Sequence, residues 1–337
     1  MKRVLLAGAG HAHAALLASL AKAPLYGARF TLVSPQARAL YSGMVPGVIA
    51  GHYHVEEAQF DVAALAARAA VEFVAAGIES LDLAARSATL SDGPSIGYDL
   101  CSLNIGSCTP APSHAVSAKP FGELVEKLRF ASHVAVAGGG AAGAELAMAL
   151  RHRGGEVTLY SEQSTLPKRV ERALRRCRVD FRPGMRVDAV EEGPVVVSGS
   201  ARQHFDLVLW ATGPAAFPWL RASGLTTDEA GFVRVDGSLR SVSHPEVFAL
   251  GDCAALGEPK AGVYAVRHAR VLEQNLRNLV LRQPLVQYEE NRPALMLLSC
   301  GRRYAIASRG TWSAQGRWVW WWKNWIDRGW IRRLAGR

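Results

Sequence analysis

Two glycine-rich turns are the residues whose types and spacing point most directly to chemistry. They are Gly8-Ala9-Gly10-His11-Ala12-His13, after the apolar run Val4–Ala7, and Gly138-Gly139-Gly140-Ala141-Ala142-Gly143, after Val134–Ala137. In such a turn the first glycine allows a tight bend, the second lets backbone approach a pyrophosphate, and the third lets helix pack on strand. The following helix N-terminus offers N–H groups to the phosphates. Two such turns predict two dinucleotides that exchange electrons.

The two turns differ in how well they match the three-glycine pattern. Gly143 completes the second turn, whereas His13 occupies the place where the first turn should have its third glycine. For either turn taken alone, the alternative is an ordinary glycine turn of an α/β protein that binds nothing.

Three later segments place small or polar residues at the ends of apolar runs. They are Val247–Leu250 before Gly251-Asp252, Phe205–Trp210 before Ala211-Thr212-Gly213, and a degenerate copy of the latter, Tyr98–Leu103 before Asn104-Ile105-Gly106-Ser107. A carboxylate at a strand end, such as Asp252, can accept hydrogen bonds from a polyol. The ribityl chain of a flavin is such a polyol.

The order of these five motifs resembles that of flavoproteins with two dinucleotide-binding domains, over about residues 1–290. That group includes pyridine nucleotide–disulfide reductases, type II NADH dehydrogenases and sulfide:quinone oxidoreductases. A closer resemblance is to the flavoprotein module found alone or fused to selenophosphate synthetase. It is carried by Leu40–Tyr53, Lys119-Pro120, Pro259–Arg267 and Trp322–Arg328. The resemblance implies bound FAD, with NADH or NADPH as co-substrate.

The expected fold is α/β, with two Rossmann-like domains, one inserted in the other, and a small C-terminal unit. The resemblance implies an FAD-binding domain at 1–115 and 241–290, an NAD(P)-binding domain at 116–240, and a third unit at 291–337. Within the third unit, Tyr304–Arg309 and Arg317–Trp321 are predicted as strands on either side of Gly316, followed by a short helix.

Composition narrows the class of protein. A length of 337 residues suggests about two domains, and the five cysteines include no C-x-x-C pair, which argues against a zinc site or a disulfide framework. No apolar run approaches the roughly 18 residues that span a bilayer. We therefore expect a cytoplasmic protein without a metal site. Much of the net charge of +10 comes from basic residues at 168–178 and in the C-terminal tail. Because no nucleic-acid-binding motif accompanies them, a solvated helix face at 168–178 is favoured over nucleic-acid binding.

The residues expected to bind FAD come from the turns and from the resemblance. They are Gly8, Gly10, His11, Ala12, Ser34, Pro35, Tyr41, Ser42, Gly43, Met44, Ile78, Gly106, Ser107, Gly251, Asp252, Val263 and Tyr264. Ser34 stands where an acidic residue usually closes the second strand, so a hydroxyl or backbone would hold the adenosine ribose. The Tyr41–Met44 segment is expected along the isoalloxazine, with a plain surface loop as the alternative.

The residues expected at the nicotinamide cofactor are Gly138, Gly140, Gly143, Glu162 and Gly213. A carboxylate at Glu162 would accept the ribose 2′-OH and favour NADH over NADPH, although it stands one residue late and Arg169 is near.

Three residues are expected in catalysis: Glu145, Lys119 and Arg267. Glu145 resembles the glutamate beside the nicotinamide ring, with stabilisation of a helix N-terminus as the alternative. The resemblance places Lys119 near flavin N5, with a solvated head group as the alternative. Arg267 would face an anionic acceptor or the reduced flavin.

The electron acceptor is a small molecule that the motifs do not fix. No paired cysteine follows Ser34, which argues against a dithiol relay, while Cys253 and Cys300 leave sulfur chemistry open. Where type II NADH dehydrogenases have two glutamines near the quinone, this chain has Val263 and Arg267. We expect an FAD-dependent NAD(P)H oxidoreductase acting on a quinone or another small acceptor. The alternatives are a selenium- or sulfur-compound oxidoreductase and a non-enzymatic FAD-binding partner protein.

The tail is rich in tryptophan and arginine. Residues 317–325 contain five of the nine tryptophans, and Trp330-Ile331-Arg332-Arg333 follows. This composition is typical of peripheral anchors at a membrane surface, here its inner face. A cap over the flavin domains and a homodimer interface are the alternatives.

Overall fold

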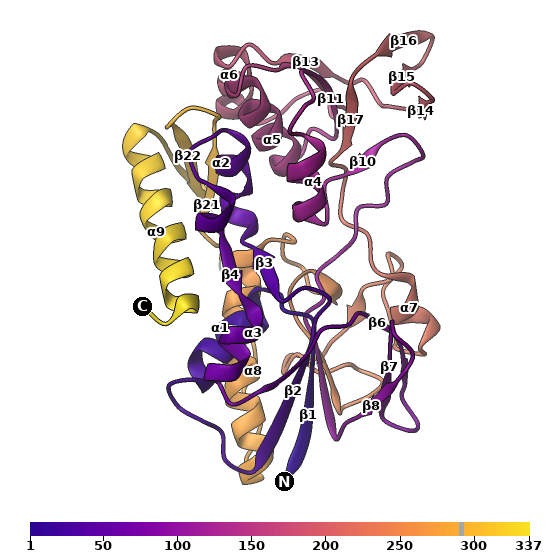
Figure 1. The fold of residues 1–337 in the computed structure, drawn as a ribbon, viewed down its shortest axis with the longest axis vertical. Helices are drawn as coiled ribbons and strands as arrows, with labels where there is room; N and C mark the ends of the chain where they lie inside the picture. The colour runs from indigo at the N-terminus through magenta and orange to yellow at the C-terminus, as the bar shows by residue number, and fades with distance from the viewer. Residues whose placement is uncertain (290–292) are drawn as a thin grey trace.

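The computed structural model describes residues 1–289 and 293–337 and contains two five-stranded parallel sheets (Figure 1). The first has the order β19-β9-β1-β2-β5, with bounds Val247–Ala249, Leu100–Leu103, Lys2–Ala7, Ala28–Val33 and Glu72–Val74. The second has the order β10-β17-β11-β12-β13, with bounds Val116–Ser117, Leu207–Trp210, His133–Ala137, Glu156–Ser161 and Asp180–Pro183. Their runs of consecutive buried apolar residues suit parallel strands covered on both faces.

Each sheet has its own helices and a small antiparallel sheet. The first core contains α1 (His11–Leu20), α3 (Val62–Arg68) and α8 (Gly262–Leu281). The second contains α4 (Phe121–Lys127), α5 (Ala141–His152) and α6 (Lys168–Arg176). The other face of the first sheet carries α7 (Pro218–Ala222) and the antiparallel strands β6 (Ile78–Asp82), β7 (Ser87–Leu90) and β8 (Ser95–Gly97). The other face of the second sheet carries the antiparallel strands β14 (Ala189–Glu191), β15 (Val195–Ser198) and β16 (Ala201–His204). The remaining short elements are β3 (Arg38–Leu40), η1 (Ser42–Met44), α2 (Val45–Ile49), η2 (Val55–Ala58), β4 (Gln59–Asp61), β18 (Val233–Arg234), η3 (Gly251–Cys253) and β20 (Ala254–Ala255).

Strand β19 shows how the two domains are connected. It pairs with β9 at the edge of the first sheet, although the whole second sheet lies between them in the chain. The predicted α/β fold with two Rossmann-like domains, one inserted in the other, is confirmed. The boundaries at 115 and 240 stay predictions, and the boundary at 290 lies outside the described residues.

The second glycine turn is packed too closely for side chains at two of its positions. Gly138 has φ +120°, and a Cβ there would lie 2.4 Å from the Ala211 carbonyl oxygen. At Gly143 a Cβ would lie 1.9 Å from the Gly138 carbonyl oxygen, so the third glycine lets α5 pack against its own turn. A Cβ at Gly140 would meet nothing within 4 Å, so this position faces open space.

In the first glycine turn, the His13 side chain makes hydrogen bonds at the position where Gly143 packs closely in the second glycine turn. The ring is fully buried, and its Nδ1 donates to the Gly8 carbonyl at 2.6 Å. Its Nε2 then accepts from the Ser102 hydroxyl on β9 at 2.8 Å. Burial lowers the pKa of His13 to about 4, which keeps the ring neutral as these two bonds require.

The side chain of Asn104, at the end of β9, joins three segments. Its Oδ1 accepts from the N–H groups of Ala12 (2.9 Å) and His13 (3.2 Å) in the first turn of α1. Its Nδ2 donates to the Leu250 carbonyl at 3.0 Å, just before the Gly251-Asp252 turn. A Cβ at Gly10 would lie 2.4 Å from Oδ1, so glycine is required for this approach.

The C-terminal unit departs from the prediction. Three antiparallel strands, β21 (Met296–Ser299), β22 (Ala305–Arg309) and β23 (Trp312–Gly316), precede a single long helix, α9 (Arg317–Ala335). The predicted strand at Arg317–Trp321 is wrong, because this segment forms the first turns of α9. The described α9 buries Val319, Trp320, Lys323 and Asp327, which is helical spacing.

We expect Gly143→Ala to lower the free energy of unfolding by at least about 2 kcal/mol, because its methyl group overlaps the Gly138 carbonyl. This loss should appear although alanine gains about 1 kcal/mol of helix propensity. Gly140→Ala is the matched control and should cost at most about 1 kcal/mol, as a weaker N-cap. Urea unfolding of both variants measures the difference, and equal stabilities would contradict the packing argument.

Candidate active site

Three predicted site residues meet where two neighbouring strands of the first sheet and the edge strand of the second sheet end. Ser107 follows β9, Asp252 follows β19 and Lys119 follows β10. The Lys119 ammonium donates to the Asp252 carboxylate at 3.0 Å and to the Ser107 hydroxyl at 2.9 Å, and Ser107 donates to Asp252 at 3.1 Å. The side chains of Lys119 and Asp252 remain 31% and 15% exposed. They can therefore exchange these bonds for bonds to a ligand's hydroxyl groups.

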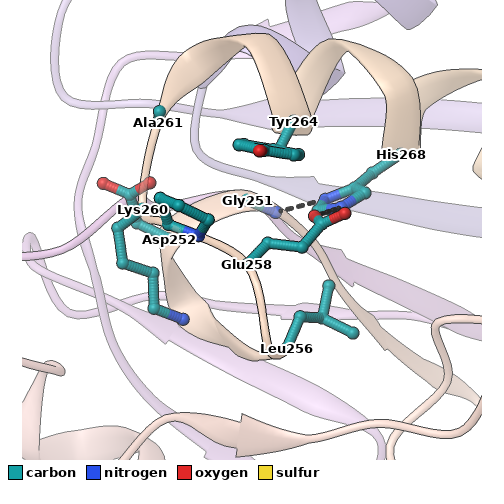
Figure 2. A pocket seen from close by; sticks show the side chains of 9 residues that line it. Gly251, Asp252, Leu256, Glu258, Lys260, Ala261, Tyr264 and His268 are labelled. Atoms are coloured by element: carbon teal, nitrogen blue, oxygen red, sulfur yellow. Dashed lines mark hydrogen bonds and ion pairs between the residues drawn. The ribbon is translucent and has the colours of Figure 1, made fainter. Parts of the chain in front are cut away.

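A small pocket lies beside this cluster, between the Gly251-Asp252 turn and the start of α8 (Figure 2). Figure 2 shows the Tyr264 ring over the turn and the His268 ring bonded to the backbone of Gly251. Val263 lies half-buried in the same first turns of α8, and the Tyr264 hydroxyl accepts the Ala294 N–H at 3.2 Å.

The two glycine turns suit dinucleotides unequally. Helix α5 begins after Gly140 without a side-chain cap from the described residues, so its first N–H groups can receive an anion. At the start of α1, the Asn104 side chain already accepts the N–H of Ala12. A pyrophosphate bound there would have to use the other N–H groups of the glycine turn. A Cβ at Gly106 or Gly213 would meet nothing within 4 Å, so backbone is open at both later strand ends. These cradles and the Ser107–Lys119–Asp252 cluster fit FAD and a nicotinamide dinucleotide.

His11 and the Tyr41–Met44 segment come together as predicted for one site. The His11 ring lies 5.4 Å from the Tyr41 ring and 6.3 Å from Trp330 of α9, and its Nε2 is 3.4 Å from the Ser42 hydroxyl. Burial lowers the pKa of His11 to about 4, against the opposing pull of Asp252. The ring is therefore neutral at physiological pH. Within the segment, Ser42–Met44 form the short helix η1, which leads directly into α2, so it is not a plain loop.

A buried ion pair that the sequence did not suggest lies on α9. Lys323 donates to Asp327 at 2.6 Å and to the Gly43 carbonyl at 2.5 Å, and the two side chains are 8% and 5% exposed. Tyr41 hydrogen-bonds to Asp327, and burial raises the pKa of both groups. Helix α9 therefore covers the segment predicted to flank the isoalloxazine, through buried charges as well as through apolar contact with Met44 and Tyr53.

Glu145 reaches the same region from α5 of the inserted domain. Its Oε1 accepts the Ser299 N–H at 2.7 Å, and burial raises its pKa while Lys323 opposes that shift. The carboxyl group therefore lies between α5, the C-terminal sheet and α9. Its predicted place beside the nicotinamide stays a prediction.

The other predicted residues lie outside the clusters described above, and several of them contact backbone groups. Ser34 is buried and its N–H donates to Val74, whereas Pro35 is exposed. Ile78 is half-buried in β6. Glu162 pairs with Arg186 at 3.5 Å, both about 70% exposed, so the pair contributes little to stability. The Arg267 guanidinium lies 5.3 Å from the Tyr264 ring centre and donates to the Pro293 carbonyl. The roles of these residues stay predictions.

Cys253 and Cys300, the two cysteines considered for sulfur chemistry, are poorly suited to it. Cys253 and Cys300 are buried, and burial raises the pKa of both thiols, for Cys253 to about 11. The thiolate is the reactive form, so neither side chain is activated at neutral pH.

Comparison with known proteins decides the family. The family model of the pyridine nucleotide-disulphide oxidoreductases matches residues 2–270. The chain belongs to this family. It is accordingly an FAD-dependent NAD(P)H oxidoreductase, and the predictions of enzyme class and cofactors are confirmed.

Relatives and structures agree with this assignment. Ferroptosis suppressor protein 1 of Xenopus tropicalis is 28% identical over 264 residues, covering 69% of this chain and 70% of that protein. An NADH dehydrogenase-like protein of Mycobacterium tuberculosis is 29% identical over 262 residues, covering 65% of each chain. The structure of the Aquifex aeolicus sulfide:quinone oxidoreductase superposes with a TM-score of 0.83 at 18% identity, over 100% of this chain and 92% of that one.

We expect each single substitution of the buried pair, Lys323→Met or Asp327→Leu, to lower the free energy of unfolding by about 3–5 kcal/mol, because it leaves one buried charge unpaired. The double variant K323M/D327L removes both charges and should be more stable than either single variant. Urea unfolding of the four proteins forms a double-mutant cycle. Additive losses would show that the two charges do not depend on each other.

Proposed function

We propose that this oxidoreductase passes electrons from NAD(P)H through FAD to a quinone or another small acceptor, without a redox-active disulfide. The observation that carries the proposal is the Ser107–Lys119–Asp252 cluster, together with the two glycine turns and with α9 covering the expected isoalloxazine side. FAD, when bound, supplies the chemistry that accepts hydride and releases electrons to the acceptor. The protein supplies orientation, charge and exclusion of water.

The chain's own residues take distinct roles in this proposal. Asp252 and Lys119 would bind the ribityl hydroxyls and the flavin edge. Glu145, whose pKa is raised by burial, would lie beside the nicotinamide site. Tyr41 and Asp327, buried under α9, would line the side from which the acceptor approaches. Burial raises the pKa of the Tyr41 hydroxyl, which therefore keeps its proton, while Asp327 is paired with the Lys323 ammonium.

The small acceptor is assigned to the quinone class for two reasons. The described thiols Cys253 and Cys300 are not activated, which disfavours the alternative of sulfur- or selenium-compound oxidation. The Aquifex aeolicus protein whose structure superposes over the whole chain is named as an oxidoreductase that uses a quinone. The resemblance to the module fused to selenophosphate synthetase remains a prediction about ancestry.

A second proposal concerns where the acceptor is met. Trp318, Trp321 and Trp325 are 56%, 50% and 67% exposed at helical spacing along α9, opposite the face that buries Val319 and Lys323. Amphipathic tryptophan with arginine suits the headgroup region of an anionic membrane. Among the described helices, none is both long and apolar enough to cross a bilayer. We propose that this face rests on a membrane that contains the quinone.

We expect purified protein to contain FAD and to be bleached rapidly by NAD(P)H without oxygen, with the colour restored by a soluble quinone. Gly140→Val should keep the flavin but slow its reduction by roughly a hundred-fold, because the side chain enters the pyrophosphate space. Gly329→Val, where a Cβ also meets nothing within 4 Å, is the matched control. Stopped-flow absorbance measures both. Protein that cannot be loaded with FAD, or equal rates in Gly140→Val and parent, would overturn the proposal.

We expect the protein to co-sediment with anionic liposomes at low salt and to be released as salt screens the attraction. Replacing Trp318, Trp321 and Trp325 by serine should lower binding at least about ten-fold. Serine at Tyr26 and Phe130, exposed aromatics of other segments, is the control and should change little. If the parent ignores anionic liposomes and the triple variant instead abolishes dimers in sedimentation velocity, the face is a dimer interface.

A further inference from the structure

His268 lies beneath the Gly251-Asp252 turn, outside the set predicted from sequence. Its Nδ1 accepts the Gly251 N–H at 3.0 Å, and its Nε2 lies 3.1 Å from a carboxylate oxygen of Glu258 (Figure 2). The side chains of His268 and Glu258 are 2% and 6% exposed. A buried hydrogen bond thus connects helix α8 to the backbone turn that presents Asp252.

The hydrogen bonds define one protonation state of the ring. Since Nδ1 accepts from Gly251, the proton of the neutral ring is on Nε2, which donates to Glu258. The other oxygen of Glu258 accepts from the Tyr288 hydroxyl at 2.5 Å, and the Tyr288 ring stands at 90° to the imidazole, 4.6 Å away. Glu258 thus receives two donors and fixes the tautomer, as carboxylates do for metal-bound and catalytic histidines.

The charges around the ring are mixed. Glu258 favours the protonated ring, whereas Lys260 and Arg267 oppose it. Burial is the largest influence and lowers the pKa of His268. Tyr288 faces the ring edge, and burial raises its pKa, so it stays a neutral donor.

The turn that His268 holds has little freedom to move. Gly251 has φ +63°, and a Cβ there would lie 2.8 Å from Asn104 Nδ2 and 3.1 Å from the Ala265 side chain. Asn104 also binds the Leu250 carbonyl, on the other side of the turn. The Gly251 N–H is therefore the point at which α8 determines where Asp252 is placed.

We propose that His268 is a positioning residue for FAD: its neutral ring holds the Gly251-Asp252 turn in the shape that presents Asp252 to the ribityl hydroxyls, and protonation of its Nδ1 releases the turn and weakens FAD binding. This rests on the proposed placement of FAD at Asp252. No proton or electron is transferred to substrate in this role.

The sign of the pH effect follows from the bond. Only the neutral ring can accept the Gly251 N–H, because protonated Nδ1 would set N–H against N–H. FAD affinity should therefore be complete above the pKa of His268 and fall as pH decreases through it. Other acidic groups also weaken FAD at low pH, so the effect must be measured as a difference between variants.

Two substitutions separate the bond from the bulk of the ring. His268→Asn places an amide oxygen where Nδ1 lies and keeps the acceptor for Gly251, but it cannot be protonated. His268→Phe keeps the ring volume and removes the acceptor. The FAD dissociation constants of apo-protein are measured by flavin fluorescence from about pH 8 to about pH 4. This range extends below the ordinary histidine range because burial lowers the pKa of His268.

We expect His268→Phe to weaken FAD binding by roughly ten-fold near pH 8, since a buried N–H loses its partner, and His268→Asn to restore most of it. As pH falls, the parent should lose affinity more steeply than the asparagine variant. Parent-like affinity in the phenylalanine variant, or equal pH profiles in parent and asparagine variant, would overturn the proposal.

Nitrogen-15 NMR of histidine-labelled parent, with His268→Asn for assignment, tests the bond even if the phenylalanine variant does not fold. An unprotonated Nδ1 and a protonated Nε2 support the proposal, and the opposite tautomer contradicts it. If the parent fails to bind FAD while the tautomer is as described, the proposed function has failed rather than the hydrogen bond.

Discussion

The structure depends on the close approach of the first glycine turn to the end of β9, where the buried side chain of Asn104 is placed. One amide group binds two N–H groups of α1 and the carbonyl of Leu250. It therefore fixes, relative to one another, the turn expected at the FAD pyrophosphate and the strand end that carries Asp252. An aspartate there would lack the donor for Leu250. A hydrophobic residue would take the acceptor from the N–H groups of Ala12 and His13 and leave the Leu250 carbonyl with the weak Cys253 thiol donor.

The second domain reaches the same geometry without such a side chain. Its glycine turn lies directly against the Ala211 carbonyl, and Gly143 replaces the contact that His13 makes with hydrogen bonds in the first domain. The first domain is thus bonded internally, while the start of α5 is left uncapped by the described chain. This difference suits a cofactor that stays bound in one domain and a co-substrate that exchanges in the other.

The sequence predicted what is local and missed what needs distant partners. Glycine turns and strand ends carry their function in adjacent residues, so the fold and the strand-end positions of Ser107 and Asp252 could be anticipated. Lys119 came from the family resemblance, and its contact with the other two residues was not predicted. Arg317–Trp321 was misread because short apolar runs do not distinguish strand from helix. Lys323 and Asp327 have the spacing of an ordinary surface pair, and only the packing of α9 over Gly43 buries them. Asn104 and His268 likewise act through contacts that spacing does not reveal.

The late position of β19 has a consequence for synthesis on the ribosome. The first sheet lacks its edge strand until residues 247–249 have left the exit tunnel, whereas the second sheet is complete by 210. The inserted domain can therefore fold first, while β9 waits with an unpaired edge that invites wrong pairing. Because Asp252 arrives with the same strand, a nascent chain cannot assemble the proposed ribityl site before the inserted domain exists. Cofactor capture is thus a late event that marks a nearly finished molecule.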